Sequence, residues 1–246
     1  MDSGYYAAFS GLLARTEALD GVASNLANSG TKGFRAEREY FRSAIMGPEA
    51  SDSQLNRVVN DFGVIGGNKL DFGQGALSPT GNPLDLAIEG QGFFAIQTPN
   101  GIRYTRNGQF QRTAPNGTLT TEQGEPVLDA QNRPILVPQG EITVSSEGVL
   151  SVNGAAVANL GLWNFDSTDS ITPEGINHYA PVNGAKPTAA KAASVHQGAL
   201  ESSNQDVIQG TMQLILVQRQ AEMMQRAVTI FNNDFDKTAS EELPKV

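Results

Sequence analysis

Two apolar stripes that advance in alternating steps of three and four residues, one near each end of the chain, restrict the possible folds most strongly. This spacing is that of a heptad seam, by which one long helix packs along another. The N-terminal stripe consists of Tyr5, Phe9, Leu12, Thr16, Leu19, Ala23 and Leu26. The C-terminal stripe consists of Val207, Gly210, Leu214, Val217, Ala221, Met224, Val228, Phe231 and Phe235. We therefore expect two long terminal helices that pack on each other and offer contacts to neighbouring copies of the chain.

The middle of the chain has the pattern of short antiparallel strands. The dipeptide Asn-Gly, which is typical of tight hairpin turns, occurs at 100–101, 107–108, 116–117, 153–154 and 183–184. Short runs with alternating apolar residues lie between these turns, as at 84–89, 142–144 and 149–152. Strands repeated this closely favour an antiparallel barrel or sandwich.

Together the two patterns predict an α+β protein. Paired, coiled-coil-like N- and C-terminal helices flank a central antiparallel all-β domain, which is a barrel or a sandwich. We assign residues 1–35 to the N-terminal helix and the turn after it, 36–75 to an extended connection, 76–200 to the β-domain and 201–246 to the C-terminal helix. The connection is expected to have little regular structure, because several glycines interrupt its apolar residues.

Composition excludes several kinds of protein. The net charge of −9 repels nucleic-acid phosphates, so we expect no nucleic-acid partner. The chain has no cysteine, which excludes disulfides, thiolate metal sites and a cysteine nucleophile. No run of about 18 apolar residues is present, so we expect no membrane insertion. The first residues lack the charged and apolar regions of a cleaved signal peptide.

The apparent chemical motifs have simpler interpretations. Residues 90–95 have the letters of a dinucleotide-binding fingerprint, but a strand pattern follows them where that site needs a helix. The two histidines, His178 and His196, have no recognisable motif around them. We therefore expect no enzyme activity, no catalytic residue, no cofactor and no metal site.

Three stretches of the chain resemble the motifs of bacterial flagellar rod and hook proteins. The first is Ser24–Arg35, at the end of the N-terminal stripe. The second is Gly81–Phe94, followed by Tyr104–Gly108, and the third is Gln197–Asn204, just before the C-terminal stripe. They occur in the order found in that family and cover both ends and the middle of the chain.

The resemblance implies a structural subunit of the flagellar basal-body rod, most like a proximal rod subunit. In this family the terminal helices pair to form an inner tube that transmits torque and encloses the export channel, and the β-domain faces outward. The implied partners are other rod proteins, copies of the chain in a helical array, and the flagellar export apparatus during secretion. The implied location is the basal body in the periplasmic space, reached by export without a cleaved signal peptide.

The resemblance also implies two sets of assembly residues. The helix-core contacts are Leu12, Leu19, Leu26, Leu214, Val217, Met224, Val228 and Phe231. The signature turn comprises Asn25, Asn28, Thr31, Gly33 and Phe34, a set that is also compatible with a plain helix C-cap. We expect the terminal helices of a lone subunit to be frayed, because an isolated helix is marginal in water.

Three alternatives remain open. A distal rod or hook-like subunit would differ in its position along the shaft. A non-flagellar β-domain binding module with a helical dimerisation stalk would form a closed dimer. A β-domain enzyme acting on a sugar or peptide would need two carboxylates about 5–10 Å apart in a cleft, and no sequence pattern suggests such a pair.

Overall fold

The computed structural model of the chain describes residues 2–42, 64–182 and 184–241, which fall into two compact units. The helical unit comprises residues 1–26, 37–69 and 207–246, and the β unit comprises residues 27–36 and 70–206. Each unit therefore contains segments from distant parts of the sequence. Both ends of the chain belong to the helical unit.

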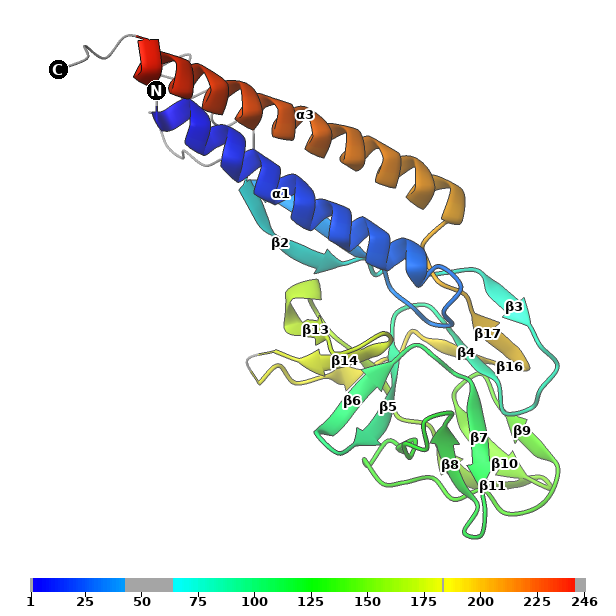
Figure 1. The fold of residues 1–246 in the computed structure, drawn as a ribbon. Helices are drawn as coiled ribbons and strands as arrows, with labels where there is room; N and C mark the ends of the chain where they lie inside the picture. The colour runs from blue at the N-terminus through cyan, green and yellow to red at the C-terminus, as the bar shows by residue number, and fades with distance from the viewer. Residues whose placement is uncertain (1, 43–63, 183, 242–246) are drawn as a thin grey trace. The chain divides into compact units, whose positions relative to one another are not determined.

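The helical unit is built on two long helices, α1 (Asp2–Ala27) and α3 (Val207–Glu241), which lie side by side (Figure 1). Helix α1 buries a face of small residues that includes Ala14, Ala18 and Val22. These residues recur every four positions and so lie on one side of the helix. Their small side chains allow another element to approach the α1 backbone closely. The pairing of the terminal helices is confirmed.

Strands β1 (Glu37–Arg42) and β2 (Val64–Leu70) form a two-stranded sheet. Residues 36–75 were expected to have little regular structure, and this pairing differs from that expectation. One of the glycines that suggested an irregular connection, Gly67, packs closely against an aromatic ring. Gly67 has a φ of +135°, and a Cβ built on it would lie 3.3 Å from the Tyr40 hydroxyl. A glycine is needed here because the aromatic ring crosses the strand closely.

The β unit consists of short strands in several small sheets. In chain order the strands are β3 (Leu77–Pro79), β4 (Leu86–Glu89), β5 (Phe93–Thr98), β6 (Gly101–Thr105), β7 (Phe110–Thr113), β8 (Thr118–Thr121), β9 (Ile142–Val144), β10 (Val149–Val152), β11 (Ala155–Asn159), β12 (Leu162–Asn164), β13 (Ile171–Pro173), β14 (His178–Pro181), β15 (Thr188–Ala189), β16 (Ser194–Gln197) and β17 (Ala199–Glu201), with a 3-10 helix η2 (Thr168–Ser170) before β13. Strands whose register is described all pair antiparallel.

The largest sheet has six strands in the order β13-β14-β6-β5-β12-β15, and a three-stranded sheet has the order β11-β10-β9. Three further pairs are β16-β4, β17-β3 and β7-β8. The α+β class with a central antiparallel β region is therefore confirmed. The pairs β16-β4 and β17-β3 join segments that are far apart in the sequence, which brings the end of the β unit back to its beginning.

Turn chemistry and apolar packing explain these strands. At the β10–β11 hairpin, Asn153 and Gly154 both have positive φ, at 51° and 82°, as a type I′ turn requires. The neighbouring strands contribute to one apolar core that includes Leu86, Ile88, Phe94 and Leu150. A second core holds Leu70, Phe93, Ala95, Tyr104, Leu128, Phe165, Ile171 and Tyr179. The Asn-Gly turn predicted at 183–184 begins at a position that lies outside the described residues.

Candidate functional site: a buried ionic cluster that joins three motifs

The three motifs found in the sequence meet around the carboxylate of Glu201, which lies at the end of β17 and is 1% exposed. Glu201 Oε1 is 2.8 Å from Arg35 Nη2, and Glu201 Oε2 is 3.0 Å from Arg106 Nη1. Both arginine side chains are also almost completely buried. Arg35 comes from the first motif, Arg106 from the second and Glu201 from the third. We call Arg35, Arg106 and Glu201 the ionic cluster.

Most of the other hydrogen bonds of the cluster side chains are made with backbone amides and carbonyls. Glu201 Oε1 accepts a hydrogen bond from the Gly75 amide at 2.9 Å. Arg106 donates to the carbonyls of Ile88 at 3.0 Å and Gly90 at 2.5 Å, and Arg35 donates to the carbonyl of Gly73. These carbonyls compensate two buried cations that share a single carboxylate, as buried charges require.

The electrostatics of the cluster follow from its burial. Burial lowers the pKa of Arg106 to about 10, and the neighbouring Arg35 acts in the same direction while Glu201 opposes both. The guanidinium of Arg106 also lies over the Phe93 ring, 5.4 Å from its centroid. Tyr179, on β14, accepts a hydrogen bond from the Arg35 amide at 3.1 Å. Burial raises the pKa of the Tyr179 phenol, which therefore stays neutral under ordinary conditions.

Two residues of the signature turn, Gly33 and Phe34, form backbone hydrogen bonds with residues of the third motif. The Gly33 amide donates to the Glu201 carbonyl at 2.8 Å, and the Phe34 carbonyl accepts from the Asn204 amide at 3.3 Å. Gly33 has a φ of +68°, and a Cβ built on it would lie 2.3 Å from the Asn107 nitrogen. Only glycine fits this position, because the backbone between Arg106 and Asn107 occupies the space of a side chain.

The side chain of Asn204 links both ends of the β unit. Its Oδ1 accepts from the Ala36 amide at 2.7 Å, and its Nδ2 donates to the carbonyls of Asp71 at 2.9 Å and Gly73 at 3.0 Å. The side-chain amide of Asn204 therefore binds three backbone groups, which belong to two separate segments of the chain. The segments that lead out of α1 and into α3 are thus fixed to each other within the β unit.

The other residues of the signature turn shape the exit of α1. Asn25 is buried and pairs with the backbone of Glu37: its Nδ2 donates to the Glu37 carbonyl at 2.7 Å, and its Oδ1 accepts from the Glu37 amide at 3.0 Å. Thr31 donates from its amide to the Asn28 carbonyl at 3.1 Å and from its hydroxyl to Asn28 Oδ1 at 3.3 Å. Asn25 therefore holds the start of β1 against the end of α1.

The predicted helix-core residues of α1 lie beside its buried face. Leu12, Leu19 and Leu26 are partly buried, and Phe9 on the same stripe is 49% exposed. The fully buried positions, Ala14, Ala18 and Val22, were not selected from the sequence. The heptad pattern favoured large side chains, whereas the buried face of this helix consists of small ones.

The predicted residues of α3 lie on its less exposed side. Leu214, Val217, Met224 and Val228 are partly buried, on the same side as the buried Gly210. Phe231 belongs to α3, but its side chain lies outside the described part of the chain. Their role in assembly stays a prediction.

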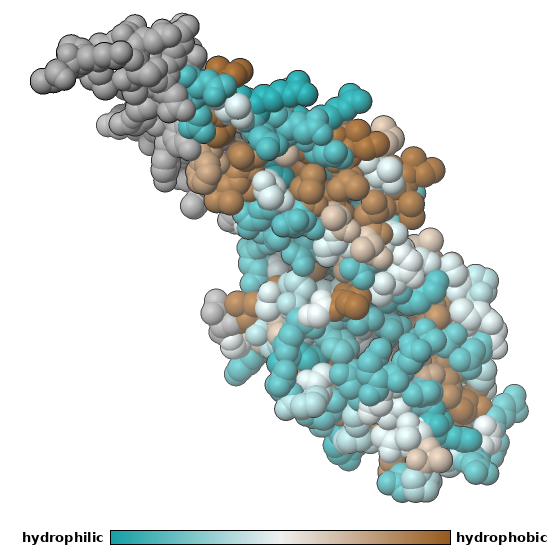
Figure 2. All heavy atoms as spheres, viewed as in Figure 1, coloured by the Kyte–Doolittle hydropathy of each residue, from teal (hydrophilic) through white to brown (hydrophobic). Residues whose placement is uncertain are grey.

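The opposite side of α3 is also apolar, and it is exposed. Figure 2 shows hydrophobic residues gathered over the two helices. The exposed stripe consists of Ile208, Met212, Ile215, Leu216, Met223 and Ile230, each between 47% and 73% exposed. Positions spaced in this way share one side of a helix. We call these six residues the outer stripe of α3. Large exposed apolar patches are typical of surfaces that contact another protein, a membrane or a ligand.

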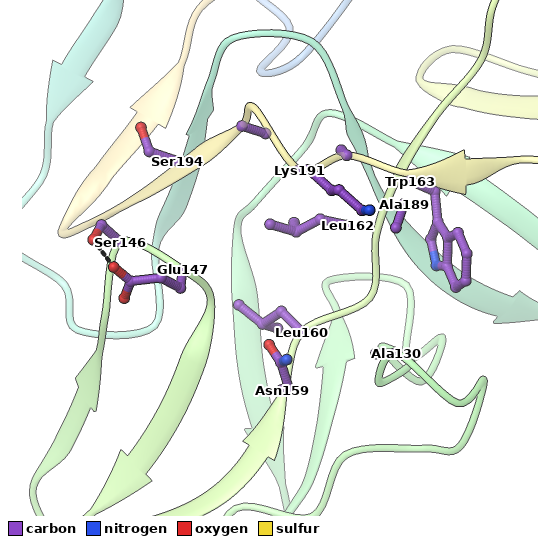
Figure 3. A pocket seen from close by; sticks show the side chains of 12 residues that line it. Ala130, Ser146, Glu147, Asn159, Leu160, Leu162, Trp163, Ala189, Lys191 and Ser194 are labelled. Carbon is purple, nitrogen blue, oxygen red and sulfur yellow. Dashed lines mark hydrogen bonds between the residues drawn. The ribbon is translucent and has the colours of Figure 1, made fainter.

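A cavity in the β unit has a volume of about 490 Å³ (Figure 3). Leu160, Leu162 and Trp163 contribute apolar groups to its lining, and Glu147 and Lys191 contribute charged ones. Hydrogen bonds from Ser145 and the Glu147 amide, and then from Ser146, lower the pKa of the Glu147 carboxyl. Glu147 is the single carboxylate among the described residues that line the cavity, so a pair of catalytic carboxylates is not available there.

No group of three or more His, Asp or Glu side chains among the described residues is placed to hold a metal ion. None of the described helices is long and apolar enough to cross a membrane.

The ionic cluster was not predicted as a site, although all its members lie inside the motifs. A signal was present in the sequence, because Glu201 follows an apolar strand residue and Arg106 lies between a strand and an Asn-Gly turn. Charged residues at such positions need partners of opposite charge. The sequence contained no means of pairing Glu201 with Arg35 and Arg106, which are 166 and 95 positions away.

The sequence of the chain is similar to those of several known proteins. The model of the flagellar hook protein FlgE/F/G D1 domain matches residues 87–152. The chain is 34% identical over 249 residues to the flagellar basal-body rod protein FlgF of Caulobacter vibrioides, with all of both chains covered. It is 35% identical to FlgF of Mesorhizobium japonicum over 89% of each chain. It is 30% identical to the rod protein FlgG of Borreliella burgdorferi, over 93% of this chain and 94% of FlgG.

Proposed function

The chain belongs to the flagellar basal-body rod proteins of the FlgF type, a structural and non-enzymatic family, and on this premise we propose that it is a subunit of the proximal rod. In this proposal it assembles with copies of itself and other axial proteins into a helical tube. The tube transmits torque and encloses the export channel. In this proposal the chain reaches the periplasmic space through the flagellar export apparatus.

The outer stripe of α3 is the observation that carries this proposal. One side of α3 is partly buried within the subunit, and the opposite side leaves six large apolar residues exposed. A helix that is apolar on two sides needs partners on both. Contacts between unlike surfaces of successive copies can continue without closing, which is how a helical filament forms.

The ionic cluster supports a mechanical role for the β unit. Two ion pairs between almost completely buried side chains, together with several backbone hydrogen bonds, fix the segments that carry Arg35, Arg106 and Glu201. Such a network resists displacement, because moving one segment leaves charged groups without partners. We propose that it keeps these segments of the β unit in place under load.

A lysine in the outer stripe tests the assembly proposal. Leu216 is 59% exposed, so Leu216→Lys should change the stability of the lone chain by no more than about 0.5 kcal/mol. We expect it to abolish incorporation into the rod and to make cells non-motile. Gln225→Lys places the same charge at an exposed polar position of α3 and serves as the matched control. The measurements are motility and electron cryo-microscopy of basal bodies.

The results of these experiments distinguish the proposed function from its alternatives. Normal rods with Leu216→Lys would contradict an interface at the outer stripe. A tagged chain found in the distal part of the shaft would favour the hypothesis of a distal rod or hook-like subunit. A purified chain that stops at a discrete dimer, by sedimentation, would favour the binding module with a helical stalk.

A further inference from the structure

We propose that a small cavity beside the ionic cluster binds one water molecule, which joins Arg106 to Asn164 on β12. Neither the motifs nor the assembly proposal assigns any ligand to this position. The site lies wholly within the β unit, and the proposal does not depend on how the chain assembles.

The cavity has the size of one water molecule. Its volume is about 10 Å³, and its walls include Arg35, Arg106, Phe93 and Asn164. A cavity of about 10–15 Å³ is sufficient for a single water when polar groups line it. Arg106 and Phe93 are each 3% exposed, so the cavity is well shielded on their side.

Three buried polar atoms of the residues that line it lack a hydrogen-bond partner among the described residues: Arg35 Nη2, Arg106 Nε and Asn164 Oδ1. Arg35 Nη2 is ion-paired with Glu201 at 2.8 Å, which leaves Arg106 Nε and Asn164 Oδ1 as the unsatisfied pair. Both Nη atoms of Arg106 already bind Glu201 and the carbonyls of Ile88 and Gly90, so Nε is the nitrogen of this guanidinium for which no described hydrogen bond exists. A buried polar atom without a partner is costly, and such atoms in proteins are nearly always satisfied by protein or water.

The chemistry of the two atoms selects the ligand. Arg106 Nε–H can only donate a hydrogen bond, and an amide oxygen such as Asn164 Oδ1 can only accept one. A water molecule does both at once, since it can accept from Nε and donate to Oδ1. An anion such as chloride would bind the two arginines, which carry one more positive charge than Glu201 balances, but it would be repelled by Oδ1. The pair of unlike atoms therefore specifies water.

The water would extend the ionic cluster to a fourth segment. Asn164 lies on β12, which pairs with β5 and β15 in the six-stranded sheet. Arg106 follows the end of β6 in the same sheet. A bridge between them would connect the cluster to a strand outside the three motifs.

Crystals of the full chain grown in sodium bromide give the first test. We expect one peak within about 3.2 Å of both Arg106 Nε and Asn164 Oδ1, with no bromide anomalous signal. An anomalous peak there would overturn the proposal in favour of an anion site, with the amide turned to donate. An empty cavity, or one filled by a shifted side chain, would also overturn it.

A solution measurement complements the crystal. A water held in this site should give a cross-peak to the Arg106 Nε proton in water–protein NMR spectra, a resonance that Arg106→Lys identifies by its loss. Asn164→Leu removes the acceptor and should abolish the cross-peak, whereas Asn164→Asp keeps a carboxyl oxygen there and should preserve it. A cross-peak of equal strength in Asn164→Leu would show that Asn164 does not hold the water. If Asn164→Leu fails to fold, the Asn164→Asp comparison and the crystal still decide.

Discussion

Gly33 stands where the backbones of two motifs come too close for any side chain. Its amide binds the Glu201 carbonyl, and its α-carbon faces the peptide between Arg106 and Asn107. The sequence indicated a special role for this glycine, because it lies in the signature turn. The space around it could not be predicted, since it is set by the second motif, more than 70 positions away.

We expect Gly33→Ala to destabilise the chain far more than Gly81→Ala. The two glycines have similar φ values, +68° and +75°, so alanine strains the backbone by about 1–2 kcal/mol at either position. At Gly33 the added Cβ also meets backbone atoms at 2.3–2.7 Å, whereas at Gly81 nothing lies within 4 Å. The difference between their free energies of unfolding in urea isolates the steric clash. Equal losses would show that φ alone makes Gly33 necessary.

Tyr179 gives the folded chain a specific dependence on alkaline pH. Burial raises the pKa of its phenol above the ordinary value of 10, while the Arg35 amide and charge act in the opposite direction. The pKa is therefore higher in the folded chain than in the unfolded chain. The associated stability is fully present below about pH 10 and is lost as the pH rises further, because the unfolded chain releases its proton first.

The expected result is a smaller loss of stability above pH 10 in Tyr179→Phe than in the unsubstituted chain. Urea unfolding at pH 8 to 11 measures it, and the titration of Arg106, present in both chains, largely cancels in the comparison. Tyr40→Phe, at a position 42% exposed, controls for the removal of one tyrosine. Parallel stability curves for the unsubstituted chain and Tyr179→Phe would contradict a buried, neutral phenol.

At the scale of elements, α1 and α3 differ in how well their sequence patterns describe their packing. The stripe of α3 coincides with its less exposed side, at Leu214, Val217 and Val228. The stripe of α1 lies to one side of the buried Ala14 and Ala18. Periodicity identifies the helices and their large apolar positions, but a helix packed through small residues gives only a weak apolar signal.

The strand pairings could likewise be predicted only in part. The hairpins with Asn-Gly turns, such as β10–β11, follow from local sequence. The pairing of β17 with β3 depends on residues more than 100 positions apart and has no local signal. Local turns were therefore predictable, whereas long-range pairings required the structure.

We expect the terminal helices to gain order on assembly. The outer stripe of α3 leaves large apolar side chains without a partner in a lone chain, and a helix with so little burial frays easily. Far-ultraviolet circular dichroism of the monomer should therefore show less helix than the full lengths of α1 and α3, and the helix signal should rise on polymerisation. A monomer with full helix content, unchanged by assembly, would refute this expectation.

At the scale of the whole molecule, the ionic cluster connects three segments that are far apart in the sequence. We call these three connected segments the joint. The motifs that carry the family resemblance are the segments that supply Arg35, Arg106 and Glu201. Their similarity to rod proteins could be recognised from the sequence alone. The reason that these stretches belong together is a physical one, namely the mutual satisfaction of buried charges, and it appears only in the folded chain.

Glu201→Gln should destabilise the chain by about 3–5 kcal/mol, because it leaves two buried arginines without a carboxylate. Glu89→Gln is the matched control: Glu89 is an exposed carboxylate that pairs with His196, and its loss should cost less than about 1 kcal/mol. Chemical denaturation of both variants measures the difference. A Glu201→Gln chain as stable as the control would mean that backbone carbonyls alone suffice to hold both guanidinium groups.

The separation of these partners along the sequence also imposes an order on synthesis. A ribosome completes Arg35 and Arg106 long before it reaches Glu201 and Asn204, which bind groups as far as 168 positions earlier. A growing chain therefore carries two arginines whose carboxylate does not yet exist, and the joint cannot close early. A truncated product that ends before Glu201 never acquires it. The joint can therefore form only after translation has passed the last strand of the β unit.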